Sequence, residues 1–158
     1  MVFQELLDTE RNYVKLLSHV LEQYRKKLEI SQMISGTDLR QIFGNLPEIC
    51  KMHAQLEKEM ENVMDKWSQE ALVGHVMAGF CEKFLVHYPP YLNYLEQALL
   101  RIKELSDTNS KFKIFLKQVQ KSLEITFNSY AGGWSLWRPK AARFCGKRFR
   151  LTDCIFFS

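Results

Sequence analysis

Apolar side chains recur at steps of three and four residues through the N-terminal stretch of the chain. This spacing matches the period of an α-helix that buries one face, and it predicts a single long helix over about residues 2–29. Such a helix is long for a globular domain, so we expect it to span most of the molecule. The apolar stripe consists of Phe3, Leu6, Leu7, Tyr13, Val14, Leu17, Val20, Leu21, Tyr24 and Leu28.

One carboxylate, Glu10, lies within this stripe, between Leu7 and Tyr13. A carboxylate at a buried position costs free energy unless it has a partner. Two interpretations are open. Glu10 forms an internal salt bridge with an Arg or Lys on a neighbouring helix, or the first turns of the helix reach a surface that receives a partner. The second interpretation, which we favour, makes Glu10 a binding residue.

Length and composition suit one α-rich domain. The chain has 158 residues, of which 46% are hydrophobic and 13% aromatic, enough for a sizeable core. Seven glycines and four prolines are few for the many tight turns of an all-β fold. No apolar run approaches the length of a membrane span, and the N-terminus does not resemble a secretory leader. We therefore expect a soluble, cytoplasmic protein.

A second and a third helix are expected after the first. Residues 38–43 begin the second, which Gly44 interrupts. Asn45, Pro47 and Glu48 then suit the N-cap, the first turn and the capping box of the third helix, whose apolar stripe continues to about Trp67.

Further helical segments follow. One starts at Ser68, and Pro89 and Pro90 are expected to break or sharply kink it. Helix is expected again over residues 91–105, and the last expected helix runs over about residues 111–124.

The C-terminal stretch has a different character. Its aromatic residues follow neither a helical nor a strand period, and residues 121–158 hold 7 Lys/Arg against 2 Asp/Glu, whereas residues 1–120 hold 15 against 16. A basic, aromatic segment can bind anionic lipid headgroups or nucleic acid. Because the aromatic residues of this segment show no amphipathic period, we favour the alternative that its charge is accidental. We do not expect nucleic-acid binding.

Histidine and cysteine residues do not form a recognisable metal or catalytic site. Cys50 and His53 lie three residues apart, and His75 and His87 are candidates to join them. Zinc sites usually show two short ligand pairs, which are absent here, so we favour core packing for these side chains. No combination of nucleophile, base and orienting group is evident. We expect no metal, cofactor or covalent chemistry.

Four segments together resemble the Dbl homology domain, the catalytic module of Rho-family guanine nucleotide exchange factors. They occur in the order that this family uses. The segments are Glu5-Leu-Leu-Asp-Thr-Glu-Arg-Asn-Tyr-Val-Lys15, Ile42-Phe-Gly-Asn-Leu46 with Glu48 and Ile49, the set Tyr88, Tyr91, Asn93, Tyr94 and Ala98, and Phe112 with Phe115 and Leu116.

The resemblance implies an elongated all-α helical bundle that binds a Rho-family small GTPase. It implies that Glu10 contacts the first switch segment of the GTPase and helps to loosen its nucleotide. The resemblance covers about residues 1–120, and residues 121–158 form an atypical basic tail. There the family would have a long helix with a Lys-x-x-x-Arg-x-x-x-Tyr-Pro-Leu-Leu-Leu pattern, which this sequence lacks.

Three functions are therefore considered. The first is an exchange factor module that is truncated at its C-terminal end. Its activity would be impaired because it lacks the family's C-terminal helix, which would contact the second switch segment. The second is an exchange-dead fragment that binds a GTPase or serves as a scaffold. The third is a lipid-binding or nucleic-acid-binding protein that acts through the basic tail.

Overall fold

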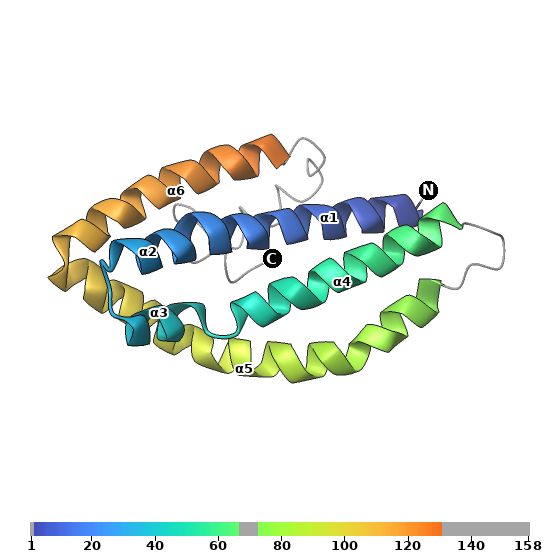
Figure 1. Cartoon of the computed structure of the whole chain (residues 1–158), viewed down its shortest axis with the longest axis horizontal. Coiled ribbons are helices and arrows are strands. Elements are labelled where there is room, and N and C mark those ends of the chain that lie inside the picture. The colour runs from blue at the N-terminus through green and yellow to red at the C-terminus, as the bar shows by residue number, and fades with distance from the viewer. Residues whose placement is uncertain (1, 67–72, 131–158) are drawn as a thin grey trace, which may run out of the picture. The chain divides into compact units, whose positions relative to one another are not determined.

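The structure, a computed structural model, describes residues 2–66 and 73–130. All regular elements in these residues are helices (Figure 1). Their bounds are α1 Val2–Val20, a π-helical turn η1 Leu21–Arg25, α2 Lys26–Ser31, α3 Gly36–Phe43, α4 Leu46–Asp65, α5 Val73–Thr108 and α6 Ser110–Tyr130. The predicted all-α fold is confirmed. The helix predicted to start at Ser68 is described from Val73 on, where it forms the first part of α5. Residues 68–72 and the basic tail after residue 130 lie outside the described residues.

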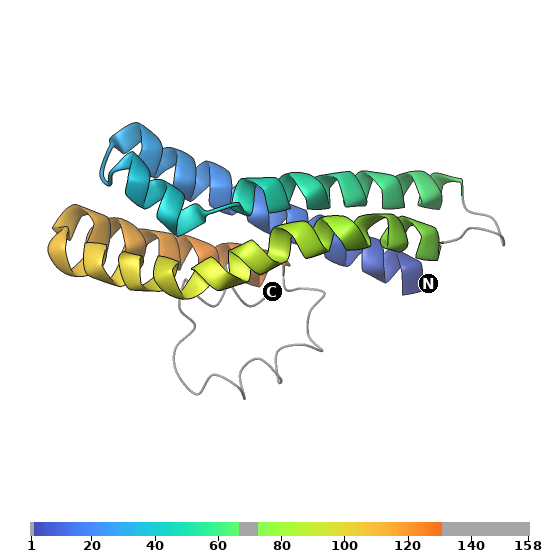
Figure 2. The ribbon, with the colours of Figure 1, turned by 90° about the horizontal axis from the view of Figure 1, so that it is seen from below.

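The chain divides into two compact units, residues 1–101 and 102–158. In the first unit, α1 packs along α4, and the N-terminal part of α5 lies beside α4 (Figures 1 and 2). The core between these three helices is formed by Phe3 and Leu7 of α1, Met52, Leu56 and Met60 of α4, and Phe80 of α5. The stripe that predicted the first helix therefore supplies one side of this core.

The first helix is continuous from Val2 to Ser31 but changes its winding at η1, where one π-helical turn occurs. Three core residues, Val20, Tyr24 and Leu28, are 5% exposed or less along this part. A π-helical turn rotates the helix face slightly, because it holds more residues per turn than an α-helix. The apolar period predicted the extent of the helix, but it did not reveal this turn.

Of the break or sharp kink expected at Pro89 and Pro90, the break does not occur, because α5 continues through both prolines. A proline removes one backbone N–H, so the carbonyl group four residues earlier loses its partner. Those carbonyl groups belong to Leu85 and Val86, which are 73% and 63% exposed. At an exposed position water can supply the missing hydrogen bond, which makes an uninterrupted helix tolerable.

The last helix also extends further than predicted, to Tyr130 instead of about Glu124. The prediction relied on apolar periodicity, which ends near residue 125. No glycine or proline occurs between Ser110 and Tyr130, so nothing in the backbone ends the helix earlier. Asn109 precedes this helix, and its Oδ1 accepts a hydrogen bond from the Phe112 N–H at 3.1 Å.

Candidate functional site

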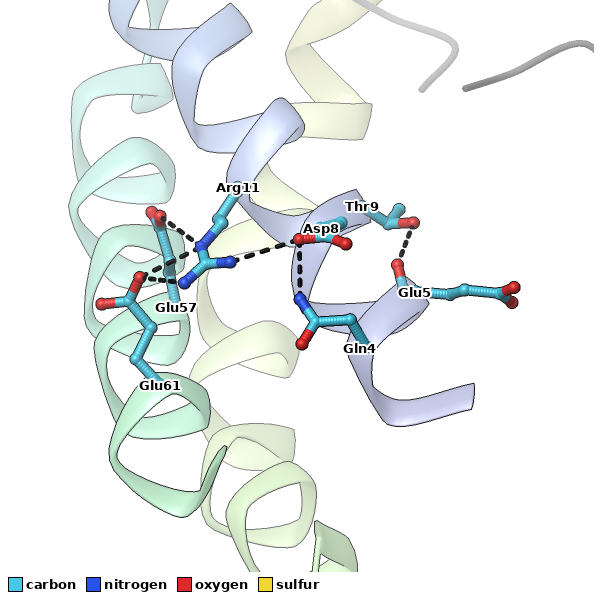
Figure 3. Close-up of polar contacts among 7 residues, drawn as sticks. All are labelled: Gln4, Glu5, Asp8, Thr9, Arg11, Glu57 and Glu61. Atoms are coloured by element: carbon cyan, nitrogen blue, oxygen red, sulfur yellow. Dashed lines mark hydrogen bonds and ion pairs between the residues drawn. The ribbon is translucent and has the colours of Figure 1, made fainter. Parts of the chain in front are cut away.

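The first turns of α1 expose a polar face. Glu5, Asp8 and Thr9 are exposed, and their hydrogen bonds stay within the helix: Gln4 Nε2 donates to Asp8 Oδ1 at 3.0 Å, and Thr9 Oγ1 donates to the Glu5 carbonyl at 2.7 Å. In Figure 3 the Glu5 carboxylate points away from α4. This face is therefore a carboxylate-bearing surface that a second protein can reach.

Arg11 joins α1 to α4 beside this face (Figure 3). Its Nη2 and Nε donate to Glu61 Oε1 at 2.7 and 3.1 Å, its Nη1 donates to Asp8 Oδ1 at 3.2 Å, and its Nε lies 4.0 Å from Glu57 Oε1. The bond to Glu61 is the main reason that the pKa of Arg11 is raised. Burial raises the pKa of the Glu57 carboxyl, and the negative charge of Glu61 is the second cause of this rise. Arg11 thus fixes the register of α1 against α4.

Glu10 lies on a different side of α1 and bonds inside the protein. Its Oε1 is 2.6 Å from His53 Nδ1 on α4, and the Glu10 and His53 side chains are 14% and 7% exposed. The structure thus supplies an internal partner, as the first interpretation required, but the partner is a histidine and not an Arg or Lys. Binding of a GTPase by Glu10 stays a prediction.

Two tyrosines extend the contact. His53 Nε2 is 2.7 Å from the Tyr88 hydroxyl on α5, and the Tyr88 and Tyr13 hydroxyl groups are 3.2 Å apart. Burial raises the pKa of Tyr13, and the bond to Tyr88 raises it further. Burial also raises the pKa of Tyr88, whereas the bond from Tyr13 lowers it. Both hydroxyl groups therefore keep their protons at neutral pH.

Asn45, from the second of the four sequence motifs, connects the start of α4 to α5 next to Tyr88. Asn45 precedes α4, but its side chain makes no N-cap bond, contrary to the prediction. Its Nδ2 instead donates to the His87 carbonyl at 2.7 Å, one residue before Tyr88. Pro47 lies in the first turn of α4, as predicted, and Gly44 has a φ of 48°, which favours glycine.

The other candidate ligands do not converge. In the described parts of the chain, no three His, Cys, Asp or Glu side chains are placed to hold a metal ion. Cys50 Sγ lies 3.6 Å from Ser18 Oγ, and both ring nitrogens of His53 are engaged. Within the same residues, no helix is both long and apolar enough to span a membrane.

Sequence reasoning singled out Glu10 and passed over Glu5. Glu5 lies outside the apolar stripe, and this position predicts that its side chain is exposed. Glu10 was selected because it lies within the stripe. His53 was considered only as a metal ligand or core residue, since a partner for Glu10 was sought among Arg and Lys.

Comparison with known proteins decides the family. The model of the RhoGEF domain matches residues 2–131 of the chain. The chain belongs to the RhoGEF domain family. Protein ECT2 of Mus musculus is 26% identical over 121 residues, which cover 73% of this chain and 13% of ECT2. Rho guanine nucleotide exchange factor 10 of Homo sapiens is 28% identical over 125 residues, covering 77% of this chain and 9% of the relative.

A solved structure shares the fold of this RhoGEF chain. The apo structure of the activated truncation of Vav1 aligns with a TM-score of 0.70 at 20% identity, covering 97% of this chain and 33% of that one. The chain thus spans only a small part of the length of its curated relatives.

Proposed function

We propose that this chain is an exchange module that binds a Rho-family small GTPase and promotes the release of GDP. The observation that carries the proposal is the RhoGEF family match over residues 2–131, together with relatives such as Rho guanine nucleotide exchange factor 10. Such a protein needs no covalent chemistry. It accelerates release by binding the nucleotide-free GTPase more tightly than the nucleotide-bound form. A GTPase partner of this class also agrees with the predicted cytoplasmic location.

The proposed contact surface is the N-terminal half of α1. Glu5 offers an exposed carboxylate there. Glu10 has one oxygen engaged by His53, and its side chain keeps 14% exposure. We propose that Glu10 contacts the GTPase through this exposed remainder and that Glu5 adds a second acidic contact. The exposed apolar Leu6, at 39%, is next to Glu5 in the sequence and can add an apolar contact.

We further propose that the 158-residue chain releases GDP weakly. The Lys-x-x-x-Arg-x-x-x-Tyr-Pro-Leu-Leu-Leu pattern expected for the second switch contact does not occur in its sequence. Contacts to one switch segment alone stabilise the nucleotide-free state less than contacts to both. The second candidate is therefore a GTPase-binding or scaffolding fragment without exchange activity. Contact of the basic tail with an anionic membrane stays a prediction from the sequence.

The test measures GDP release from Rho-, Rac- and Cdc-type GTPases and the binding of each nucleotide-free GTPase. We expect binding to at least one of them, with release well below that of a longer RhoGEF protein. Failure of the folded chain to bind any of them would contradict the proposed function. Rapid GDP release would contradict only the proposed impairment.

Point variants locate the surface. Glu5→Ala and Glu10→Ala should each weaken binding by about tenfold, because each removes a charged contact worth about 1.5 kcal/mol. Glu22→Ala, an exposed acidic residue of η1, is the matched control and should bind normally. Unchanged binding by a folded Glu10→Ala variant would refute the role of Glu10, whereas the same result for Glu5→Ala would refute only that of Glu5.

A further inference from the structure

The first four turns of α6 carry charge of one sign only. Between Asp107 and Glu124 the sequence holds four lysines and no Asp or Glu. All four lysine side chains are exposed, and the ion pairs of the described residues include none of them. The four are Lys111, Lys113, Lys117 and Lys121. Their positive charge is therefore available to a partner outside the chain.

Three of these lysines form a single row. Lys113, Lys117 and Lys121 follow one another at steps of four residues, and side chains at this spacing lie on the same side of an α-helix. At the rise of an α-helix, this lysine row is about 12 Å long. Phe112 and Val119, which are 1% and 3% exposed, lie on the opposite side of the helix. The lysine row is thus the solvent face of an amphipathic helix.

Helix stability does not account for the lysine row. Like charges four residues apart on a helix repel each other and weaken it, whereas glutamates at alternate positions would have kept the face equally polar and formed ion pairs. An anionic surface placed against the row would relieve this repulsion. The charge of the row is therefore complementary to a negatively charged partner.

The composition of this surface distinguishes between anionic partners. All three residues of the row are lysine, a compact point charge, and none is arginine, whose planar fork recognises single phosphate groups in a defined geometry. Proteins that hold single-stranded nucleic acid add exposed aromatic rings on which bases stack. The exposed apolar residue beside the row is instead aliphatic, Ile114 at 58%, while Phe112 is buried and Phe115 half-buried. Diffuse lysine charge with an exposed aliphatic side chain favours a lipid bilayer.

We propose that the lysine row of α6 binds the anionic headgroups of a lipid bilayer, with Ile114 reaching the boundary between headgroups and acyl chains. The apolar side of α6 stays inside the protein, so the helix lies against the bilayer without crossing it. Each lysine near an anionic surface should strengthen binding by about fivefold, and the attachment is therefore reversible. The row has the helical period that the aromatic residues of the C-terminal tail lack, and the inference does not depend on GTPase binding.

The test measures how much of the 158-residue chain sediments with lipid vesicles, in the absence of a GTPase. One set of vesicles contains phosphatidylserine and phosphatidylcholine, and the other contains phosphatidylcholine alone. We expect binding to the first set only, and the bound fraction should fall steeply as salt rises, because salt screens exposed charges. Equal binding to both sets, or binding that salt does not weaken, would overturn the inference.

A variant with all three residues of the lysine row changed to glutamine should bind the phosphatidylserine vesicles more weakly by about tenfold or more. Glutamine has nearly the helix propensity of lysine, and the three side chains are exposed, so the variant should fold. Thermal unfolding followed by circular dichroism verifies this. Ile114→Gln should weaken the same binding by about threefold, through the loss of its apolar contact. Unchanged binding by Ile114→Gln would overturn that contact.

The matched control removes the same charge elsewhere. Lys51, Lys58 and Lys66 are exposed lysines along α4 and at its C-terminal end. A variant with these three changed to glutamine has the net charge of the lysine-row variant and should bind within about twofold of the unaltered chain. An equal loss in both variants would show that only net charge matters, and it would overturn the assignment to α6.

Two further results would move the binding to another segment or partner. The tail variant changes Arg143, Lys147, Arg148 and Arg150 to glutamine. If it loses vesicle binding while the lysine-row variant binds normally, the basic tail is the membrane contact and the inference fails. If a single-stranded oligonucleotide displaces the unaltered chain from the vesicles and the lysine-row variant no longer binds that oligonucleotide, the row serves nucleic acid and the inference also fails.

Discussion

Two acidic side chains, Glu10 and Asp38, are largely buried in this protein, and each has a different kind of partner. Glu10 bonds to His53, as described above. Asp38 Oδ1 accepts from Arg101 Nε at 2.7 Å, and its Oδ2 accepts from the Ser35 hydroxyl at 2.7 Å. The Asp38 N–H in turn donates to Ser35 Oγ at 3.0 Å, which completes a capping box at the start of α3. One carboxylate thus caps α3 and ties it to α5.

Asp38→Asn should destabilise the protein by about 1–3 kcal/mol at pH 7, because it removes a charge-assisted hydrogen bond in a nearly buried position. Burial raises the pKa of Asp38, but the bonds from Arg101 and Ser35 outweigh it, so the net pKa is lowered. Because the pKa of Asp38 is lower in the folded protein than in the unfolded chain, its charged form stabilises the fold at pH values above the unfolded pKa. This stability is lost as the pH falls through the folded pKa.

Urea unfolding of Asp38→Asn and the unaltered chain at several pH values checks this. Their difference in unfolding free energy should be full at pH 7. It should shrink below about pH 4, where the Asp38 carboxyl of the unfolded chain becomes protonated, and be lost as the pH falls through the lowered folded pKa. The exposed Asp65→Asn is the control and should show little difference at either pH. A difference that stays constant down to acid pH would show that the charge of Asp38 does not contribute.

The packing of α1 on α4 combines an apolar core with a charged edge. Leu7 and Leu56 are each 1% exposed in the core. At the edge, Arg11 makes a short bond with Glu61 but only a distant contact of 4.0 Å with Glu57. The two glutamates lie four residues apart on one helix and repel each other. They are therefore expected to have opposite effects on stability.

Glu61→Gln should lower the free energy of unfolding at pH 7 by about 0.5–1 kcal/mol, since the lost ion pair is partly exposed. Glu57→Gln should be neutral or slightly stabilising, because burial and the Glu61 charge raise the pKa of Glu57 and disfavour its charged form in the folded protein. Thermal unfolding at low and high salt measures both. A larger loss for Glu57→Gln than for Glu61→Gln would contradict the assigned pairing.

The RhoGEF family match and the last helix end at nearly the same place. The match extends to residue 131 and α6 to Tyr130, both beyond the boundary expected at residue 120. The division of the chain into two compact units falls after Arg101, within the sequence of α5. The domain boundary itself stays a prediction, and truncation tests it directly.

A chain that ends at residue 131 should keep its helical circular dichroism and unfold in one cooperative transition, because it contains every described helix and the whole family match. A chain that ends at Lys121 lacks residues 122–130 of α6 and should lose helical signal and melt at a lower temperature. Loss of cooperative unfolding in the longer of these two chains would show that residues 132–158 are needed for the fold, and equal melting of both would support the boundary near residue 120.

Local sequence patterns were sufficient for the fold class, the family and most helix positions. Steps of three and four residues place Leu7, Leu17 and Val20 on one buried face whatever packs against it, and Gly44 marks a turn through its own backbone freedom. Contacts between distant helices were not accessible in this way. The partner of Glu10 lies 43 residues away on α4, and the Asn45 amide bonds to α5 instead of capping its own helix. Helical periodicity says which side of a helix is buried, but a buried polar atom bonds to whatever group another helix brings within reach, and only the packing of α1, α4 and α5 establishes that.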